Sequence, residues 1–249
     1  MKEQFSRTEL LLGSRATERL HNAKVAVFGV GGVGGYCVEA LARSGIGSLH
    51  LYDDDTISVS NLNRQIVALH STIGQPKVQV MADRVRDINP DCDVQAFCMF
   101  YLPENADQVD LSQYDYVIDC IDTVAAKLEL ATRCIALQVP FISAMGSGNK
   151  LDPTAFTVTD ISKTEGCPLA RVMRKELRRR GITHLKVVYS SELPRTPIHP
   201  VQAEPPTQND TRPGSSARRA TPGSTPFVPA TAGLVLAGAV VRDLIGEES

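Results

Sequence analysis

A glycine-rich turn near the N-terminus is the first feature of this sequence that could do chemistry. Residues 29–35 read GVGGVGG, at the end of an apolar run at 24–29 and the start of a helical pattern at 33–43. Glycine lets the backbone turn tightly and approach a phosphate, while the N-terminus of the following helix offers free N–H donors and the positive end of a dipole. The turn therefore predicts a nucleotide site that uses Gly29, Gly31, Gly32 and Gly34.

The identity of the nucleotide is open on the glycine turn alone. Asp53 follows the next apolar run, about twenty residues after the turn, where dinucleotide-binding enzymes keep an acid that holds the ribose. An NAD-dependent dehydrogenase is therefore a rival to an ATP-binding enzyme at this point.

Two cations and a second acidic motif favour ATP. Arg64 lies in the stretch 53–65, DDDTISVSNLNRQ, and Lys77 ends the stretch 74–77, GQPK. Negative charge accumulates on the phosphate oxygens when ATP is cleaved and must be met by fixed cations, whereas hydride transfer has no need of them here. Asp122 closes the stretch 119–122, DCID, after an expected strand, where a carboxylate can hold magnesium beside a triphosphate.

The four motifs GxGGxG, DxDxxxxSNLNRQ, GQPK and DCID, in this order, resemble those of the ubiquitin-activating superfamily of adenylating enzymes. The resemblance covers residues 5–150 and implies that the chain binds ATP and Mg²⁺ and activates a carboxylate as an acyl-adenylate. It implies a ribose contact for Asp53, phosphate contacts for Asn61, Arg64 and Lys77, and a magnesium contact for Asp122. The full set of cofactor-binding candidates is Gly29, Gly31, Gly32, Gly34, Asp53, Asp55, Asn61, Arg64, Gln65 and Lys77.

The same resemblance implies a homodimer. Family members place an N-terminal arginine on the partner's ATP, and the matching residue here is Arg7, in 5–7, FSR. The catalytic candidates are therefore Arg7, Arg64, Lys77 and Asp122. A monovalent cation and a sulfur-transfer partner protein are further candidates that the residues leave open.

Two carboxylates are substrates within this superfamily: the C-terminal glycine of a ubiquitin-like sulfur carrier, and the threonyl carboxylate of N6-threonylcarbamoyladenosine in tRNA. Residues 40–47 (ALARSGIG), 148–154 (GNKLDPT), 158–164 (VTDISKT) and 168–170 (PLA) resemble the tRNA threonylcarbamoyladenosine dehydratases. The carrier-activating relatives commonly hold zinc with two CxxC pairs, which this chain lacks. The resemblance thus implies ATP-dependent dehydration, in which the adenylated carboxylate is attacked from within the same nucleoside and AMP and pyrophosphate are released.

Two other functions stay open. An adenylyltransferase that activates a sulfur-carrier protein predicts pyrophosphate exchange with that carrier, and a scaffold predicts ATP binding without turnover. Ring closure by an internal nucleophile needs no catalytic cysteine. Cys167, beside Pro168, is the only thiol that we single out, and an ordinary loop cysteine is its simpler interpretation.

A tRNA substrate requires a local basic surface, because the formal net charge of the whole chain is only -2. The pattern at 168–180 predicts a helix with an apolar stripe and a dense group of cations. Such a group can neutralise phosphates and make binding salt-dependent, although a solvated helix face is an equally weighted alternative. The tRNA-binding candidates are Arg171, Arg174, Lys175, Arg178, Arg179 and Arg180.

Alternating strands and helices must position these residues. Apolar runs predict strands at 24–29, 48–52, 94–97, 116–120, 140–143 and 185–190. Helical patterns occupy 5–22, 33–43 and 75–88, and residues 156–160 alternate as an antiparallel strand does. These elements predict an α/β protein with a Rossmann-like, mostly parallel sheet flanked by helices and an antiparallel extension in the C-terminal half.

We expect one adenylating domain over residues 1–249. Its nucleotide-binding half is 5–150, its substrate and dimer half is 151–193 with 226–249, and 194–225 is a flexible crossover segment, because nine of the fifteen prolines lie between 194 and 229. The closing run 233–245 is apolar nearly all round, and at about 13 residues it is too short to cross a bilayer. It predicts a buried helix in a subunit interface and no membrane partner.

The composition indicates a soluble, cytoplasmic protein. The apolar fraction is 43% and the charged fraction 22%, which are ordinary values for a globular chain. The six cysteines form no CxxC pair, so neither a zinc site nor a disulfide framework is indicated. Residues 1–13 lack the apolar region of a signal peptide.

Overall fold

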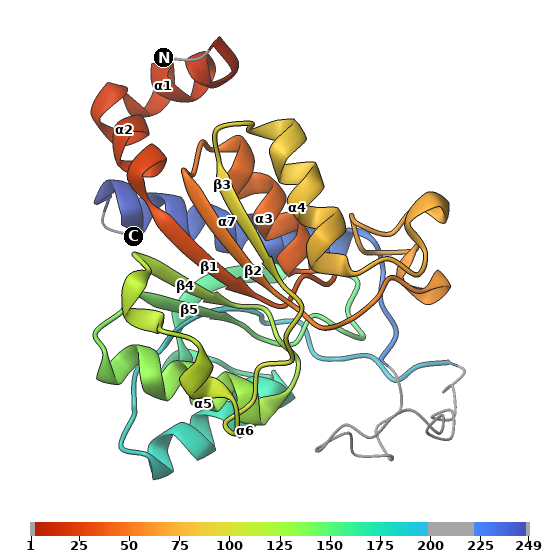
Figure 1. Ribbon diagram of the computed structural model, residues 1–249. Helices are drawn as coiled ribbons and strands as arrows, with labels where there is room; N and C mark the ends of the chain where they lie inside the picture. Colours follow the sequence, from red (N-terminus) through yellow and green to blue (C-terminus); the bar gives the residue numbers. More distant parts are fainter. Residues whose placement is uncertain (1–2, 199–221, 248–249) are drawn as a thin grey trace.

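A computed structural model describes residues 3–198 and 222–247, and its strands form one seven-stranded sheet (Figure 1). The order across the sheet is β3-β2-β1-β4-β5-β7-β6. Every neighbouring pair is parallel except β6 with β7, which is antiparallel. The prediction of a mostly parallel sheet with an antiparallel extension is confirmed. The strands are β1 (Lys24–Phe28), β2 (Ser48–Tyr52), β3 (Asp93–Phe97), β4 (Tyr116–Asp119), β5 (Phe141–Ala144), β6 (Phe156–Asp160) and β7 (Lys186–Ser190).

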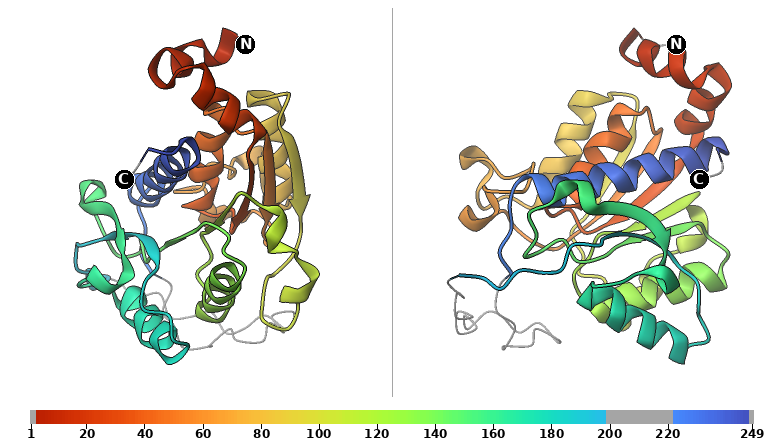
Figure 2. Two further views of the ribbon diagram at one scale, coloured as in Figure 1. Left: turned by 90° about the vertical axis from the view of Figure 1, so that its left-hand side faces the viewer. Right: turned by 180° about the vertical axis from the view of Figure 1, so that it is seen from behind.

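Helices cover both faces of the sheet, which gives three layers (Figure 2). The third, fourth and seventh helices pack on one face, and the fifth and sixth on the other. The helices are α1 (Ser6–Leu12), α2 (Ser14–Asn22), α3 (Gly34–Arg43), α4 (Lys77–Ile88), α5 (Val124–Ala136), α6 (Pro168–Arg179) and α7 (Phe227–Ile245).

Strand β1 shows why a continuous apolar run is needed at the centre of the sheet. Val25 and Val27 belong to the core beneath α3, α4 and α7, whereas Ala26 and Phe28 belong to the core beneath α5. Successive side chains of a strand point to opposite faces, so a strand covered on both faces must be apolar at every position. All four of these residues are fully buried.

The chain order reverses direction between β1 and β4. From β1 the chain builds β2 and then β3 on one side, and from β4 it builds β5 on the other. The connections that leave the carboxyl ends of β1 and β4 therefore diverge, and a crevice forms between them, which is where open parallel sheets bind ligands. The glycine turn follows β1 and the DCID motif follows β4, so the topology brings both motifs to this crevice.

Two predicted helices differ from those observed. The helix expected at 5–22 is broken at Gly13, whose φ of 82° lies in the left-handed region, into α1 and α2. The closing helix is longer than expected, because α7 begins at Phe227 and has 19 residues.

The length of α7 overturns the argument that this helix is too short to cross a bilayer. By length and composition alone it could do so, with a mean hydropathy of 1.6, and 44% of its apolar window is buried inside the protein. It lies along α3, and a Cβ added to Gly233 would fall 2.3 Å from the carbonyl oxygen of Val33. The two backbones therefore approach closely beside the glycine turn.

Candidate nucleotide-binding site

A cavity of about 650 Å³ opens at the carboxyl edge of the sheet, around the crevice between β1 and β4. Its walls come from the segments that follow β1 to β5 and from the first turns of α6 and α7. The predicted site residues in these walls are Gly29, Gly31, Gly32, Asp53, Asp55, Asn61, Arg64, Gln65, Lys77 and Asp122. The structure therefore brings together ten of the candidates, while Gly34 and Arg7 lie outside the walls.

The glycines of the turn meet different steric requirements. Gly29 has a φ of 90°, and a Cβ there would lie 2.8 Å from the carbonyl oxygen of Cys120. A Cβ on Gly34 would lie 1.8 Å from the carbonyl oxygen of Gly29, so the start of α3 packs directly against the first residue of the turn and leaves no room for a side chain at Gly34. A Cβ on Gly31 would meet nothing nearer than the Gln65 amide, at 3.9 Å. Gly31 therefore leaves the open space that a phosphate requires.

Asp53 sits between the glycine turn and the acidic loop. One carboxylate oxygen accepts the N–H of Val30 at 2.7 Å, and the other accepts the N–H of Asp55 at 2.9 Å. Burial raises the pKa of Asp53, and the opposing effects of Lys77 and of these two N–H donors are smaller. The carboxylate is thus fixed at the end of β2, where an acid can accept hydrogen bonds from ribose hydroxyls.

The two predicted cations enter the cavity from different segments. Lys77, at the first position of α4, is buried, and its ammonium lies 2.7 Å from a carboxylate oxygen of Asp55. The half-buried Arg64 donates to the carbonyl oxygen of Ser60 at 2.8 Å. Both are therefore held by the protein before any phosphate binds, which is what electrostatic stabilisation of a developing charge requires.

Gln65 carries a polar atom that the protein leaves unsatisfied. Its side chain is 7% exposed, and among the described residues its Oε1 has no hydrogen-bond partner. A buried polar atom without a partner is costly, so such an atom in a cavity wall indicates that a ligand or water completes it.

The two acids of the DCID motif have separate roles. Asp119 is fully buried and forms an ion pair of 2.8 Å with Lys127, which is also fully buried. Ser143 donates to the same carboxylate at 2.5 Å. Asp122 is exposed and lines the cavity. Asp119 is therefore a structural support of the loop, and Asp122 is the acid of this motif that is exposed in the cavity wall.

Sequence reasoning missed Lys127, although a signal was present. A lysine in the otherwise apolar segment 124–128 is a charge on a core-facing position of α5, and such a charge requires a buried partner. Lys127 also donates to the carbonyl oxygen of Ile121 at 2.9 Å, so it fixes the loop that presents Asp122.

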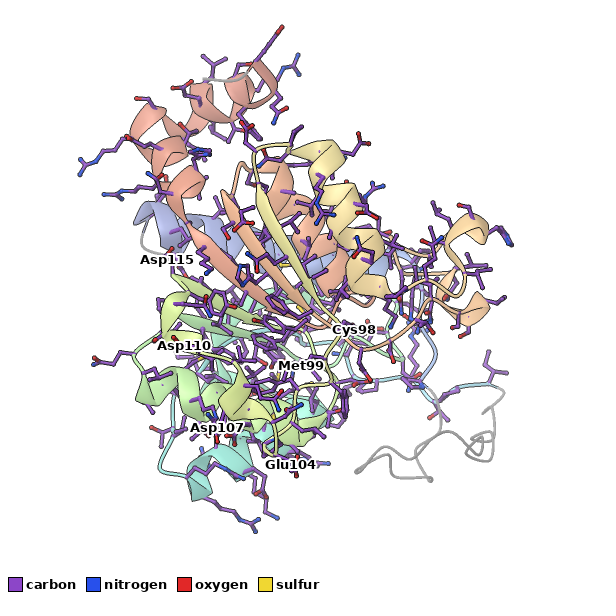
Figure 3. The ribbon with its side chains drawn as sticks, in the orientation of Figure 1. Cys98, Met99, Glu104, Asp107, Asp110 and Asp115 are labelled. Carbon is purple, nitrogen blue, oxygen red and sulfur yellow. The ribbon has the colours of Figure 1, made fainter. Side chains whose placement is uncertain are left out.

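An aromatic wall was also missed. Phe28 stacks on Tyr52 with ring centroids 4.4 Å apart, and Tyr52 stacks on Phe97 at 4.6 Å. Phe28 and Tyr52 line the cavity, as do Met99 and the two residues after it. Met99 lies where the chain leaves the carboxyl end of β3 (Figure 3). Phe28 and Tyr52 are themselves buried, so the apolar surface that this wall offers to a flat base comes from the partly exposed Met99 and Phe100.

Among the described residues, two places could hold a divalent cation. Asp122 offers an exposed carboxylate at the crevice, and the carboxylates of Asp53, Asp54 and Asp55 have oxygens within 4.8 Å of one another. Carboxylate oxygens are the ligands that Mg²⁺ prefers. In the cluster of Asp53, Asp54 and Asp55, Asp53 already accepts two backbone N–H groups and Asp55 pairs with Lys77. Asp122 therefore fits the role of a magnesium ligand better.

Arg7 lies at the opposite end of the sheet from the cavity. It is exposed on α1, and α1 and α2 precede the first residue of β1, whereas the cavity lies beyond the last. Figure 2 shows α1 projecting beyond the sheet. Arg7 therefore does not reach the cavity of its own chain.

The basic helix is observed as α6, one residue shorter than predicted. Five of its six predicted cations are exposed, and Arg171, Lys175 and Arg178 follow one another at helical spacing. Arg174 differs, because its guanidinium donates to the carbonyl oxygens of Ile161 and Thr164 and to the Thr164 hydroxyl. Leu169, at the start of α6, lines the cavity, so the exposed cations begin beside it.

The described cysteines are free thiols. Burial raises the pKa of Cys92 and of Cys134 to about 12, and it raises the pKa of Cys120, which touches the cavity, well above its ordinary value. Cys167 is buried at the N-terminus of α6. Among the thiols whose pKa is raised, none is poised to become a thiolate.

Comparisons with known proteins agree with this geometry. The sequence model of the ThiF family matches residues 5–248. The tRNA threonylcarbamoyladenosine dehydratase of Bacillus subtilis is 46% identical over 246 residues, which are 98% of this chain and 96% of that protein. The molybdopterin-synthase adenylyltransferase of Escherichia coli is 36% identical over 149 residues, 57% of each chain.

A solved structure is similar over almost the whole chain. The E. coli tRNA N6-threonylcarbamoyladenosine dehydratase TcdA, in complex with ATP, has a TM-score of 0.84 and 34% identity, covering 98% of this chain and 95% of that one. The same protein has also been solved in complex with AMP.

Proposed function

This chain belongs to the ThiF family, and from that premise we propose that it dehydrates N6-threonylcarbamoyladenosine in tRNA. The reaction is an ATP-dependent cyclisation through a carboxyl-adenylate, and it releases AMP and pyrophosphate. The observation that carries the proposal is the near end-to-end similarity to the B. subtilis dehydratase.

The rival substrate, a sulfur-carrier protein, is less well supported. The carrier-activating E. coli relative is similar over only 57% of the chain, whereas the similarity to dehydratases extends through the C-terminal half. That half and the segment before α7 contribute Leu169, Pro222 and Ser224 to the cavity wall, and residues 144–148 of the loop after β5 line it as well. We assign this part of the wall, the acceptor side, to the acceptor nucleoside.

The wall residues suggest how ATP is bound. Asp53 accepts the ribose hydroxyls, the adjoining aromatic wall covers the base, and the phosphates lie on the N–H groups of the glycine turn at the start of α3. Asn61, Arg64 and Lys77 then surround the triphosphate. In this placement the α-phosphate faces the acceptor side of the cavity.

The chemistry follows from that orientation. A carboxylate oxygen of the threonyl group attacks the α-phosphorus, the bond to pyrophosphate breaks, and a mixed anhydride with AMP forms. A nucleophile in the same nucleoside then attacks the acyl carbon, and AMP leaves with the carboxylate oxygen, so the nucleoside loses one water. Because nucleophile and electrophile belong to one molecule, ring closure has a large effective-molarity advantage.

The protein's part is to bind and to stabilise charge. Arg64 and Lys77 stabilise the negative charge that grows on the leaving phosphates. Asp122 would hold Mg²⁺, which, when bound, neutralises phosphate charge beside these cations. The ion pair of Lys127 with Asp119 keeps the loop of Asp122 in place.

We also propose that two chains associate and that Arg7 acts across the interface. Leu10 and Leu11, on the same short helix as Arg7, are 88% and 83% exposed, so α1 carries an apolar surface that a partner would cover. We assign no monovalent-cation site. A sulfur-transfer partner stays an expectation, and the cytoplasm is the expected location because the proposed substrate is a tRNA.

The proposed tRNA contacts lie on α6. The loop between β3 and β4 is unsuitable for a polyanion, because Glu104, Asp107, Asp110 and Asp115 are exposed along it (Figure 3). The exposed cations of α6 begin beside the acceptor side of the cavity and can follow the phosphate backbone away from it. They are Arg171, Lys175, Arg178 and Arg179, and Arg180 follows directly after the last residue of the helix.

Replacing Arg171, Lys175 and Arg178 with glutamate is expected to raise the KM for tRNA strongly and to leave the affinity for ATP unchanged. Each lost phosphate contact should lower the slope of log affinity against log salt by about one unit. The measurement is a salt titration of tRNA binding, with Arg86→Glu, on α4 at the other face of the sheet, as the control. Equal salt slopes in the triple variant and the wild type would show that these cations of α6 do not contact the tRNA.

The function itself is tested by mass. The purified protein is incubated with ATP, Mg²⁺ and tRNA that carries threonylcarbamoyladenosine, and the digested nucleosides are weighed. Loss of one water with release of AMP is the expected result. An unchanged nucleoside, together with pyrophosphate exchange that depends on a carrier protein, would transfer the assignment to the carrier-activating class.

A further inference from the structure

We propose that Asn149 is a positioning residue that holds residues 222–224 across the acceptor side of the cavity and so sets how tightly the acceptor nucleoside binds. We call residues 222–224 the strap. The inference deepens the proposed function and rests on it, since the acceptor is the nucleoside assigned there.

The backbone of Asn149 is unusual. Its φ of 59° lies in the left-handed region, which few residues other than glycine adopt and which asparagine tolerates better than most. Among the described residues, Gln138 is the only other non-glycine residue with a positive φ, at 56°. Asn149 lies in the loop that follows β5 and lines the cavity, which we call the wall loop. A position that keeps such a conformation beside a cavity is a candidate for a functional constraint.

Hydrogen bonds join Asn149 to the chain on both sides of residues 199–221. Its N–H donates to the carbonyl oxygen of Gly223 at 2.8 Å, and its Oδ1 accepts the N–H of Gly223 at 2.7 Å. Its carbonyl oxygen accepts the N–H of Arg195 at 2.7 Å. One residue therefore bonds to both Arg195 and Gly223, which are 28 positions apart in the chain.

The strap is held at both of its ends. A Cβ added to Gly148 would fall 2.8 Å from Cβ of Pro222, so the wall loop and the strap are in direct contact. On the other side, the amide of Asn63 donates to the carbonyl oxygen of Ser224 at 3.1 Å. Gly148, Pro222 and Ser224 all line the cavity, so the strap spans from the loop after β5 to the segment that carries Arg64.

The wall loop has anchors of its own, independent of the Asn149 side chain. The buried Lys150 donates to the carbonyl oxygen of Ser190 at 2.9 Å. The N–H groups of Leu151 and Asp152 donate to the carboxylate of Glu192 at 2.9 to 3.1 Å. Removing the Asn149 side-chain amide should therefore loosen the strap at Gly223 and leave the loop folded.

The experiment compares three variants with the wild type. Asn149→Gly keeps the left-handed backbone and loses the Oδ1 acceptor, whereas Asn149→Asp keeps an acceptor at the same place. Gln138→Gly removes the other left-handed side chain and is the matched control. Asn149→Gly is expected to raise the KM for threonylcarbamoyladenosine-tRNA about five- to tenfold, the usual effect of one lost hydrogen bond. The kcat and the Kd for ATP should stay unchanged, Asn149→Asp should restore the KM, and Gln138→Gly should behave as wild type.

Three results would overturn the proposal: an unchanged KM in Asn149→Gly, an equal loss of ATP affinity in that variant, or failure of Asn149→Asp to restore the KM. A wild-type protein that leaves the nucleoside unchanged would instead count against the proposed function. The strap is then tested by amide hydrogen exchange. Faster exchange at Gly223 in Asn149→Gly but not in Asn149→Asp supports the hydrogen bond, and equal exchange in both variants refutes it.

Discussion

Replacing Arg64 with alanine is expected to lower the rate of AMP formation about 100- to 1,000-fold while the protein stays folded, because it removes a fixed donor from the site of developing charge. Arg64 is held by the carbonyl oxygen of Ser60 and lines the cavity, so its guanidinium is in position before ATP arrives. The measurement is AMP release with threonylcarbamoyladenosine-tRNA, and near-ultraviolet circular dichroism reports on the fold.

Two companion variants separate the chemistry from general damage. Asp122→Ala should also lose AMP formation, and its activity should respond weakly to added Mg²⁺, since Asp122 is the acid assigned to that ion. Arg86→Ala removes an exposed arginine of α4 that pairs with Asp83 and should retain full activity. Full activity in both Arg64→Ala and Asp122→Ala would refute the site assignment.

Replacing Lys127 with methionine is expected to destabilise the protein by about 3–5 kcal/mol, since it leaves a buried carboxylate without its cation. Lys127 and Asp119 are both fully buried, 2.8 Å apart, so solvent does not screen the uncompensated charge. The free energy of unfolding, measured by urea denaturation, tests this. Activity should fall as well, because Lys127 holds the carbonyl oxygen of Ile121 and thus the loop of Asp122.

An exposed ion pair provides the control for Lys127. Arg133 pairs with Asp107, whose side chain is 90% exposed, and with Glu129 one turn earlier on α5. Both pairs are reached by solvent, so Arg133→Met should cost about 0–1 kcal/mol for each pair, the usual value at a surface. If Lys127→Met does not fold, the added substitution Asp119→Asn should recover folding, because it removes the stranded charge and keeps an acceptor. If Lys127→Met lowers the free energy of unfolding no more than Arg133→Met does, the argument for a stranded buried charge is contradicted.

The layered sheet was predictable because its signals are local. β1 is apolar at four successive positions, as a strand covered on both faces must be, and its end is marked by Gly29. The helix at 5–22 was predicted too long, because the apolar pattern continues past Gly13 while the left-handed backbone there breaks the helix. The closing helix was predicted too short for the opposite reason, since its first turns contain Pro229 and few large apolar residues.

The nucleotide site was predictable for a different reason. The carboxyl ends of parallel strands lie at one edge of a sheet. The residues that directly follow β1, β2 and β4 therefore lie close together, however far apart they are in the chain. Asp53 and Asp122 could therefore be placed without coordinates. Their motifs, with Arg64 and Lys77, favoured ATP, whereas carboxylate activation and the tRNA substrate class came from the resemblance to a known family.

The sequence by itself determined the parallel fold, the glycine turn and most of the predicted site residues that line the cavity, because each depends on neighbours along the chain. Only the tertiary structure decided which acid of 119–122 is structural, since that depends on Lys127 of α5 reaching Asp119. Tertiary structure also decided that Asn149 meets Gly223, a contact between segments far apart in the chain. Such contacts depend on how separate elements pack, and no local pattern of residues records them.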